Sequence, residues 1–281
     1  MDYSNRTVAE LKKLCKERGI KPYSNKKKGD LVTLLQQYDA TPIPPPFEMT
    51  SAVLELCPIP ESVNIDQMKE HINKYMPSRL PMYRATKRIL YVEDEFSEYW
   101  VSECTNGNMI GGGSCAMDVT TQNNEGIDAT CINMRETGSN EKSLIQKLKG
   151  SGKDLDQIFK DKKHNEAVKL YMDEYFNKIQ DVKKKMGLEN LYILAFVSCS
   201  NDIFLVCFKI NVENIEHVLS GGFVNSTNEE CVNIIVNNFI DPSYGNVRLY
   251  KSKKRVELRL LPSVLKSEHA VKIYTMPQIS P

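Results

Sequence analysis

Two short segments near the start of the chain have the apolar spacing of amphipathic helices. In the first, apolar residues recur three and four positions apart: Val8, Leu11, Leu14 and Cys15. Thr7 stands directly before this segment, and Glu10 lies three positions after Thr7, which is the pattern of a capping box. Gly19 ends the first helix, and a second apolar stripe follows at Leu31, Leu34, Leu35 and Tyr38. The sequence therefore predicts two short helices packed on one small core.

The rest of the chain alternates between strand-like and helix-like patterns. Short helices are predicted at residues 66–75 and 96–101, and a long helical pattern covers residues 141–187. Strands are predicted at residues 116–120 and 126–132, joined by a turn at 122–125, and continuous apolar runs predict buried strands at 191–197 and 203–210. A last hairpin is predicted at residues 246–250 and 255–261, turning at 252–254.

These patterns predict an α/β protein in two parts. Residues 1–40 form a small helical module, residues 41–47 a Pro-rich extended linker, and residues 48–281 a mixed-sheet α/β domain with a basic hairpin at its end. The fold class we expect is thus a helix-turn-helix-like module followed by an α/β/α sandwich.

Composition narrows the class of protein. Hydrophobic residues make up 41% of the chain and charged residues 26%, and no apolar run reaches the roughly 20 residues of a membrane span. The polar start, Met1 to Thr7, has no apolar stretch, so we expect no secretory signal and an intracellular protein, in cytoplasm or nucleus. The chain has eight cysteines and no CxxC pair, and its four histidines are dispersed, so we expect free thiols and no zinc site.

Charge is unevenly distributed along the chain. Residues 1–40 carry nine Lys and Arg against five Asp and Glu, while the whole chain has a net charge of +1. This part of the sequence resembles a SAP domain, on the motif Thr7-Val8-x-x-Leu11-x-x-Leu14-Cys15-x-x-x-Gly19-Ile20 followed by Lys27-Lys28-Gly29-Asp30-Leu31. The resemblance implies binding to double-stranded DNA, with phosphates meeting Lys26, Lys27 and Lys28. Two alternatives to DNA binding remain for this module: the lysines are merely a solvated helix face, or the module binds another protein.

Two aspartates on the first predicted hairpin are candidate metal ligands. Asp118 and Asp128 lie on opposite arms, and the turn between them brings them together if both side chains face one way. Paired carboxylates hold the Mg²⁺ that phosphodiester hydrolysis requires. The alternative is that both are ordinary strand-end residues.

This layout resembles the PD-(D/E)XK superfamily of restriction endonucleases. The resemblance implies a supporting helical glutamate at Glu98, metal-binding carboxylates at Asp118 and Asp128, and a catalytic lysine where this chain has Thr130. Met117 also departs from the family's proline. Lys142 is the substitute we predict, with Glu141 and Gln146 as further site residues. The implied activity is Mg²⁺-dependent cleavage of duplex DNA at a short sequence by an enzyme of the type II restriction class, with a homodimer acting on a twofold-symmetric site.

The basic residues of the last hairpin are further candidates for phosphate contacts, unless they merely protect a solvated sheet edge. They are Arg248, Lys253, Lys254 and Arg255. Two other functions stay open: a non-catalytic chromatin or virion DNA-binding protein, and a cysteine protease using Cys115. A SAP-like module on a nuclease in an Asn- and Lys-rich chain is typical of a large DNA virus or a eukaryote.

Overall fold

The chain divides into two compact units in a computed structural model. The structure describes Tyr3 and residues 6–17, 26–40, 52–86, 92–110, 115–134, 140–145, 155–214, 218, 223–225, 233–250 and 255–277. The smaller unit comprises Met1–Glu48 with Asn225–Cys231, and the larger comprises Met49–Val224 with Val232–Pro281.

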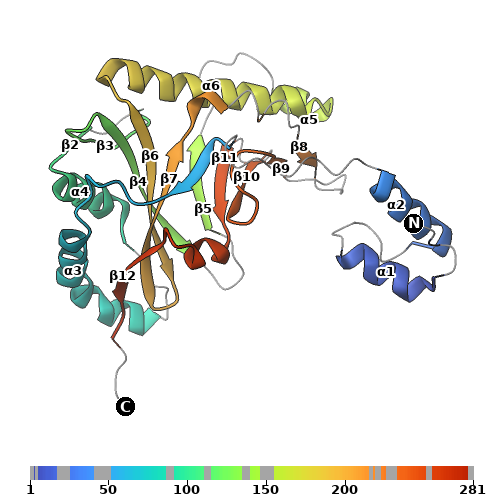
Figure 1. Cartoon of the computed structure of the whole chain (residues 1–281), viewed down its shortest axis with the longest axis horizontal. Coiled ribbons are helices and arrows are strands. Elements are labelled where there is room, and N and C mark those ends of the chain that lie inside the picture. Colours follow the sequence, from blue (N-terminus) through green and yellow to red (C-terminus); the bar gives the residue numbers. More distant parts are fainter. Residues whose placement is uncertain are drawn as a thin grey trace. The chain divides into compact units, whose positions relative to one another are not determined.

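The smaller unit is built from the two predicted helices, α1 (Val8–Glu17) and α2 (Lys28–Ala40) (Figure 1). The predicted capping box is present: the Glu10 carboxylate accepts the Thr7 backbone N–H at 2.8 Å, and the Thr7 hydroxyl accepts the Glu10 N–H at 3.3 Å. The core of this unit also uses Tyr3, which the helix pattern did not predict and which is only 1% exposed. Its buried residues are Tyr3, Leu11, Cys15, Leu31 and Leu35.

The centre of the larger unit is a mixed seven-stranded sheet, which we call sheet A. Its order is β1-β7-β6-β4-β3-β2, with β12 also paired to β7. Only the β4–β6 pair is parallel among these pairings, and the chain between these two strands crosses over through α6. The strands are β1 (Leu54–Cys57), β2 (Asn108–Met109), β3 (Val119–Thr120), β4 (Glu125–Met134), β6 (Asn190–Cys199), β7 (Asp202–Ile210) and β12 (Val271–Thr275).

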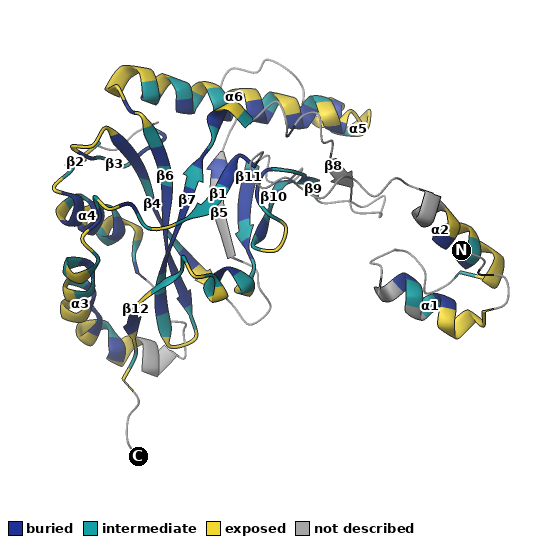
Figure 2. Ribbon diagram, viewed as in Figure 1, coloured by how far each residue is buried: buried dark blue, intermediate teal, exposed yellow. Residues whose placement is uncertain are grey.

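Sheet A is covered on both faces, which explains why β6 and β7 are apolar at nearly every position. Leu194 and Phe196 pack on the side of α3 (Ile65–Thr86) and α4 (Asp94–Thr105). The alternate residues Ile193, Ala195 and Val197 pack on the side of α6. Figure 2 shows these strands dark blue between the layers. The buried strands predicted at 191–197 and 203–210 are confirmed.

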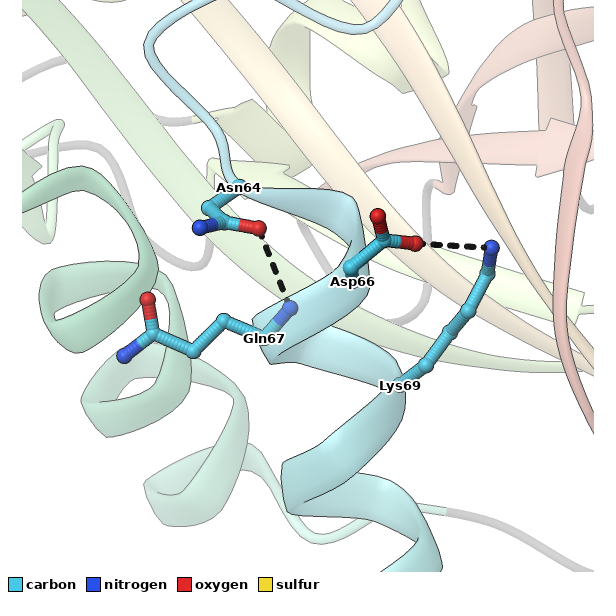
Figure 3. A network of polar contacts seen from close by, with 4 residues as sticks. All are labelled: Asn64, Asp66, Gln67 and Lys69. Atoms are coloured by element: carbon cyan, nitrogen blue, oxygen red, sulfur yellow. Dashed lines mark hydrogen bonds and ion pairs between the residues drawn. The ribbon is translucent and has the colours of Figure 1, made fainter.

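Helix α3 begins with a capped turn (Figure 3). The side-chain oxygen of Asn64 accepts the Gln67 backbone N–H at 3.1 Å, which satisfies one of the amides that a helix start leaves without an internal partner. One turn further, Lys69 forms an ion pair with Asp66 at 3.3 Å. The helix predicted at 66–75 is therefore present and is longer than the pattern indicated, running through Pro77 and Pro81.

A second sheet, sheet B, has five strands in the order β5-β11-β10-β9-β8, and the pairs from β5 to β9 are antiparallel. The strands are β5 (Asn140–Ile145), β8 (Phe223–Asn225), β9 (Asn233–Val236), β10 (Gly245–Tyr250) and β11 (Arg255–Leu260). The predicted last hairpin is confirmed as β10 and β11, with its turn outside the described residues. Its inner face shares one hydrophobic core with sheet A and α6, through residues such as Val247 and Leu258.

The prediction of a continuous helix over 141–187 is wrong at its start. Residues Asn140–Ile145 form strand β5, because they pair with β11 more than a hundred residues later in the chain. Helix α5 (Leu155–Lys160) and helix α6 (His164–Met186) follow, and Gly187 ends α6 at a φ of 66°. Figure 1 shows α6 lying across the ends of the strands of sheet A and beside β5. Two short 3₁₀ turns, Val212–Asn214 and Pro262–Lys266, complete the described elements.

Within the described part of the chain, no helix combines the length and the apolar character needed to cross a bilayer.

Candidate active site

The hairpin of β3 and β4 brings Asp118 close to Asp128. The register pairs Val119 with Ile127 and Thr120 with Gly126, and Asp118 lies just before the paired residues, where its backbone N–H donates to the Ile127 carbonyl at 2.9 Å. The Asp118 carboxylate accepts the backbone N–H of Ala129 at 2.9 Å, which holds it beside the Asp128–Ala129 peptide. The predicted hairpin is present, although its first strand is confined to Val119–Thr120 instead of residues 116–120.

The turn of this hairpin is fixed by a buried glutamate. The Glu125 carboxylate, 9% exposed as a residue, accepts hydrogen bonds from the hydroxyls of Ser62 at 2.5 Å and Thr121 at 3.0 Å. Asn124 in the same turn has a φ of 57°, a left-handed conformation that asparagine tolerates better than most residues. These contacts set the register that brings Asp118 and Asp128 together.

Both aspartates line a cavity of about 110 Å³ beneath helix α6. Three neighbouring residues of α6, Tyr175, Lys178 and Ile179, contribute to the wall, since positions three and four apart lie on one side of a helix. Strand β5 contributes Leu144. The described lining is Cys115, Ala116, Asp118, Asp128, Leu144, Tyr175, Lys178 and Ile179. Two aspartates and one lysine therefore contribute to the wall of one small cavity.

Tyr175 reports on the electrostatics of the cavity. Its ring packs against Phe239 at a centroid distance of 5.9 Å, and the residue is 5% exposed. Burial, and to a smaller extent the negative charge of Asp128, raises the pKa of the Tyr175 hydroxyl. The hydroxyl therefore stays protonated at neutral pH and is a donor beside the carboxylates, not a base.

Lys178 is the site residue that the sequence analysis missed. The apolar stripe of α6 runs through Tyr171, Tyr175, Ile179 and Val182, and Lys178 flanks that stripe instead of lying on the far, solvated side. The sequence shows a lysine beside the buried stripe of a helix, but only the position of α6 over the hairpin makes that lysine a candidate site residue.

The structure describes the other predicted catalytic residues only in part. Glu98 is on α4, which covers the face of sheet A opposite to α6, and it is not among the residues that line the cavity. Glu141 and Lys142 are on β5, at backbone positions paired with Arg259 and Leu258 of sheet B. Gln146 lies outside the described residues. The structure therefore brings together Asp118 and Asp128 from the predicted set.

Thr130, at the position where the family resemblance implies a lysine, is two residues after Asp128 on β4 and 9% exposed. Successive side chains of a strand alternate, so Thr130 belongs to the same face as Asp128. Among the described residues that line the cavity, the lysine, Lys178, comes from α6 and not from β4.

The described residues hold no cluster of three or more His, Cys, Asp or Glu side chains arranged for a metal ion. The candidate metal ligands in the cavity are therefore two carboxylates, those of Asp118 and Asp128. Mg²⁺ is commonly held by one or two carboxylates while keeping several waters, so a two-carboxylate cavity fits its donor preference. It does not fit zinc, which takes four or at least three protein ligands.

The predicted DNA contacts fall in both units. Lys27 and Lys28 are exposed at the start of α2, and Lys26, just before it, is half-buried. Arg248 and Arg255 lie on β10 and β11 of sheet B, each partly exposed. Lys253 and Lys254 lie outside the described residues.

Comparison of the chain with protein-family models, with curated proteins and with solved structures finds no match.

Proposed function

We propose that this protein is a Mg²⁺-dependent endonuclease that hydrolyses phosphodiester bonds of double-stranded DNA. The observation that carries the proposal is the meeting of Asp118, Asp128 and Lys178 in one cavity of the larger unit. The resemblance of the hairpin and its carboxylates to restriction endonucleases supports the same reaction class.

Each residue has a distinct role in this proposal. Asp118 and Asp128 would hold Mg²⁺, which supplies a bound water of lowered pKa and neutralises charge on the phosphate when present. Lys178 places a positive charge beside the carboxylates, where it stabilises the extra negative charge of a phosphate undergoing attack. Tyr175, whose hydroxyl stays protonated, would be a hydrogen-bond donor to a bound phosphate, and its buried ring helps exclude bulk water from the inner wall of the cavity.

The smaller unit supports DNA as the substrate. Its capped two-helix pair with a buried core has the organisation that the SAP resemblance implies, and its lysines stand where α2 begins. Lysine side chains next to the amides of a helix start favour phosphate binding. We therefore propose that this unit supplies DNA affinity and the larger unit the chemistry.

A cysteine protease is the weaker proposal. Cys115 does line the cavity, but no histidine is among the described residues that line it with Cys115, and a catalytic thiol needs an adjacent base.

A plasmid-cleavage assay of the full chain tests the proposal, with Mg²⁺ or with EDTA. We expect Mg²⁺-dependent cleavage that falls at least about 100-fold in Asp118→Asn, Asp128→Asn and Lys178→Met, because each change removes charge from the reacting centre. Asp181→Asn and Lys185→Met remove the same charges from exposed positions of α6 and should cleave like the wild type.

Three outcomes would contradict the nuclease. Cleavage that persists in EDTA or in both cavity aspartate variants rules out the assigned site. Intact plasmid with DNA still retarded on a gel indicates a binding protein without this activity. Proteolysis blocked by iodoacetamide and unaffected by EDTA would point to Cys115.

A further inference from the structure

The outer face of sheet B carries an unusual group of charged side chains. Val247, Leu249 and Val256 point into the hydrophobic core, so the alternate residues of β10 and β11 lie on the other face. The register sets Arg248 opposite Glu257. We call the six residues of this face the arginine face: Asn246, Arg248, Tyr250, Arg255, Glu257 and Arg259.

Glu257 is the anchor of the arginine face. It is completely buried, whereas the side chains of Arg255 and Arg259 are 34% and 17% exposed. Glu257 forms an ion pair with Arg255, and its second carboxylate oxygen lies 4.0 Å from an amino group of Arg259. A buried carboxylate must be compensated, so these contacts hold the two guanidinium groups in fixed positions over it. Of the charged side chains that β10 and β11 place on this face, the arginines are therefore the ones that solvent reaches.

Arg248 adds a third guanidinium whose contacts are with neutral groups. Its Nε donates to the side-chain oxygen of Asn246 at 2.6 Å. It also hydrogen-bonds Tyr250, and this bond lowers the pKa of that hydroxyl, although burial raises that pKa more strongly. The ring of Tyr250 in turn lies 5.3 Å from the guanidinium carbon of Arg259. Aromatic stacking and hydrogen bonds orient the arginines before any ligand arrives.

The charge of this face suits a phosphate polymer. At the register positions of this face three arginines stand against two glutamates, Glu257 and Glu141 of β5, which pairs with Arg259, so the face keeps a net positive charge. Burial lowers the pKa of Arg259, which means that its cation is incompletely solvated and gains from a nearby anion. Planar guanidinium forks match the paired oxygens of a phosphodiester better than lysine does.

We propose that the arginine face binds the sugar-phosphate backbone of double-stranded DNA, as a second DNA-binding surface besides the smaller unit. The inference rests on the proposed function for its choice of DNA, and it assigns part of the affinity to the larger unit itself. Binding here is independent of base sequence, because phosphates carry no sequence information.

Fluorescence anisotropy of the full chain with a labelled duplex, in EDTA so that no cleavage occurs, tests this proposal. Arg248→Gln is the main variant, because Arg248 contacts the neutral side chains of Asn246 and Tyr250 and its loss leaves Glu257 with its ion pairs. We expect binding about five- to tenfold weaker and a salt slope reduced by about 0.9 for one lost phosphate contact. Arg248→Lys keeps the charge and loses the fork, so it should fall between wild type and Arg248→Gln.

Lys185→Gln is the matched control, since it removes one positive charge from an exposed position at the end of α6. The proposal for the arginine face is wrong if Arg248→Gln leaves the DNA affinity and the salt slope unchanged, or changes them no more than Lys185→Gln does. Asp118→Asn separates the two proposals, because it tests cleavage and leaves the arginine face unaltered. If the nuclease assignment is wrong, the anisotropy data still measure DNA binding by Arg248. If the proposal for the arginine face is wrong, Mg²⁺-dependent cleavage can still be measured.

Discussion

The carboxylate of Asp118 belongs to the sheet as well as to the cavity. It accepts the backbone N–H of Ala129, a residue that is 6% exposed. Removing this acceptor with alanine would leave a buried amide unsatisfied, at a cost of about 1–3 kcal/mol. Asparagine keeps an oxygen at that position and removes only the charge. The asparagine variants therefore separate an effect on chemistry from an effect on folding.

Glu10 gives a test at a single exposed residue. Two hydrogen bonds lower the pKa of its carboxyl from the ordinary value of 4.5: the larger effect comes from the Thr7 backbone N–H and the smaller from the Thr7 hydroxyl. A carboxyl whose pKa is lowered on folding stabilises the folded state above its unfolded pKa, and this contribution is lost as the pH falls through the folded value. We expect α1 to fray first as the solution becomes more acidic than about pH 4.5.

An NMR titration of the Glu10 side chain in the full chain measures this pKa directly. The midpoint should lie below 4.5 and should rise part of the way toward that value in Thr7→Ala, which removes the hydroxyl bond and keeps the backbone bond. Asp66, exposed at the start of α3, provides a reference carboxylate that the substitution should leave unchanged. A Glu10 midpoint that is the same in both proteins would show that the capping box does not form in solution.

At the scale of a whole element, strand β12 is held to sheet A by its backbone pairing with β7 and also by one charged side chain of that strand. Asp202, the first residue of β7, accepts a hydrogen bond from the Thr275 hydroxyl at 2.6 Å and from the Lys272 ammonium at 2.9 Å. We expect Asp202→Ala to loosen β12 by about 1 kcal/mol, since it removes a partly exposed ion pair and a hydrogen bond together.

Hydrogen exchange read by mass spectrometry localises that effect. Amides of β12 should exchange about fivefold faster, corresponding to about 1 kcal/mol, while amides of β4 and β6 keep their protection. Glu268→Gln is the control, because that side chain is 89% exposed and its ion pair with His269 spans 4.0 Å. Unchanged β12 exchange in Asp202→Ala would mean that the backbone pairing with β7 alone retains the strand.

Elements defined by local patterns were predictable from sequence, and elements defined by distant partners were not. The hairpin of Asp118 and Asp128 has both strands and its turn within one short segment, so alternation and turn residues suffice. Strand β5 exists because β11 pairs with it, and a helix-like pattern at residues 141–145 cannot reveal that. Lys178 joins the candidate site only through the packing of α6 against the hairpin, which depends on the parallel β4–β6 pairing.

At the scale of the whole molecule, the proposal gives the smaller unit a share of the DNA affinity and the larger unit the chemistry. Among its described residues the smaller unit has five buried core residues, and a core of that size supplies only a few kcal/mol of stability. Leu31 is completely buried in it. Leu31→Ala costs about 2–5 kcal/mol and should therefore unfold the smaller unit without touching the core of the larger one.

The full-length Leu31→Ala variant thus tests whether the units act separately. Amides of α1 and α2 should lose their protection from exchange, while those of β4 and β6 keep it. Because the cavity of Asp118 and Asp128 is intact, plasmid cleavage at saturating DNA should stay near the wild-type rate, and the DNA concentration needed for half that rate should rise. Gln36→Ala, an exposed change on α2, should alter neither quantity. A lower rate at saturation would mean instead that the smaller unit takes part in catalysis, since weaker DNA capture alone is overcome by more DNA.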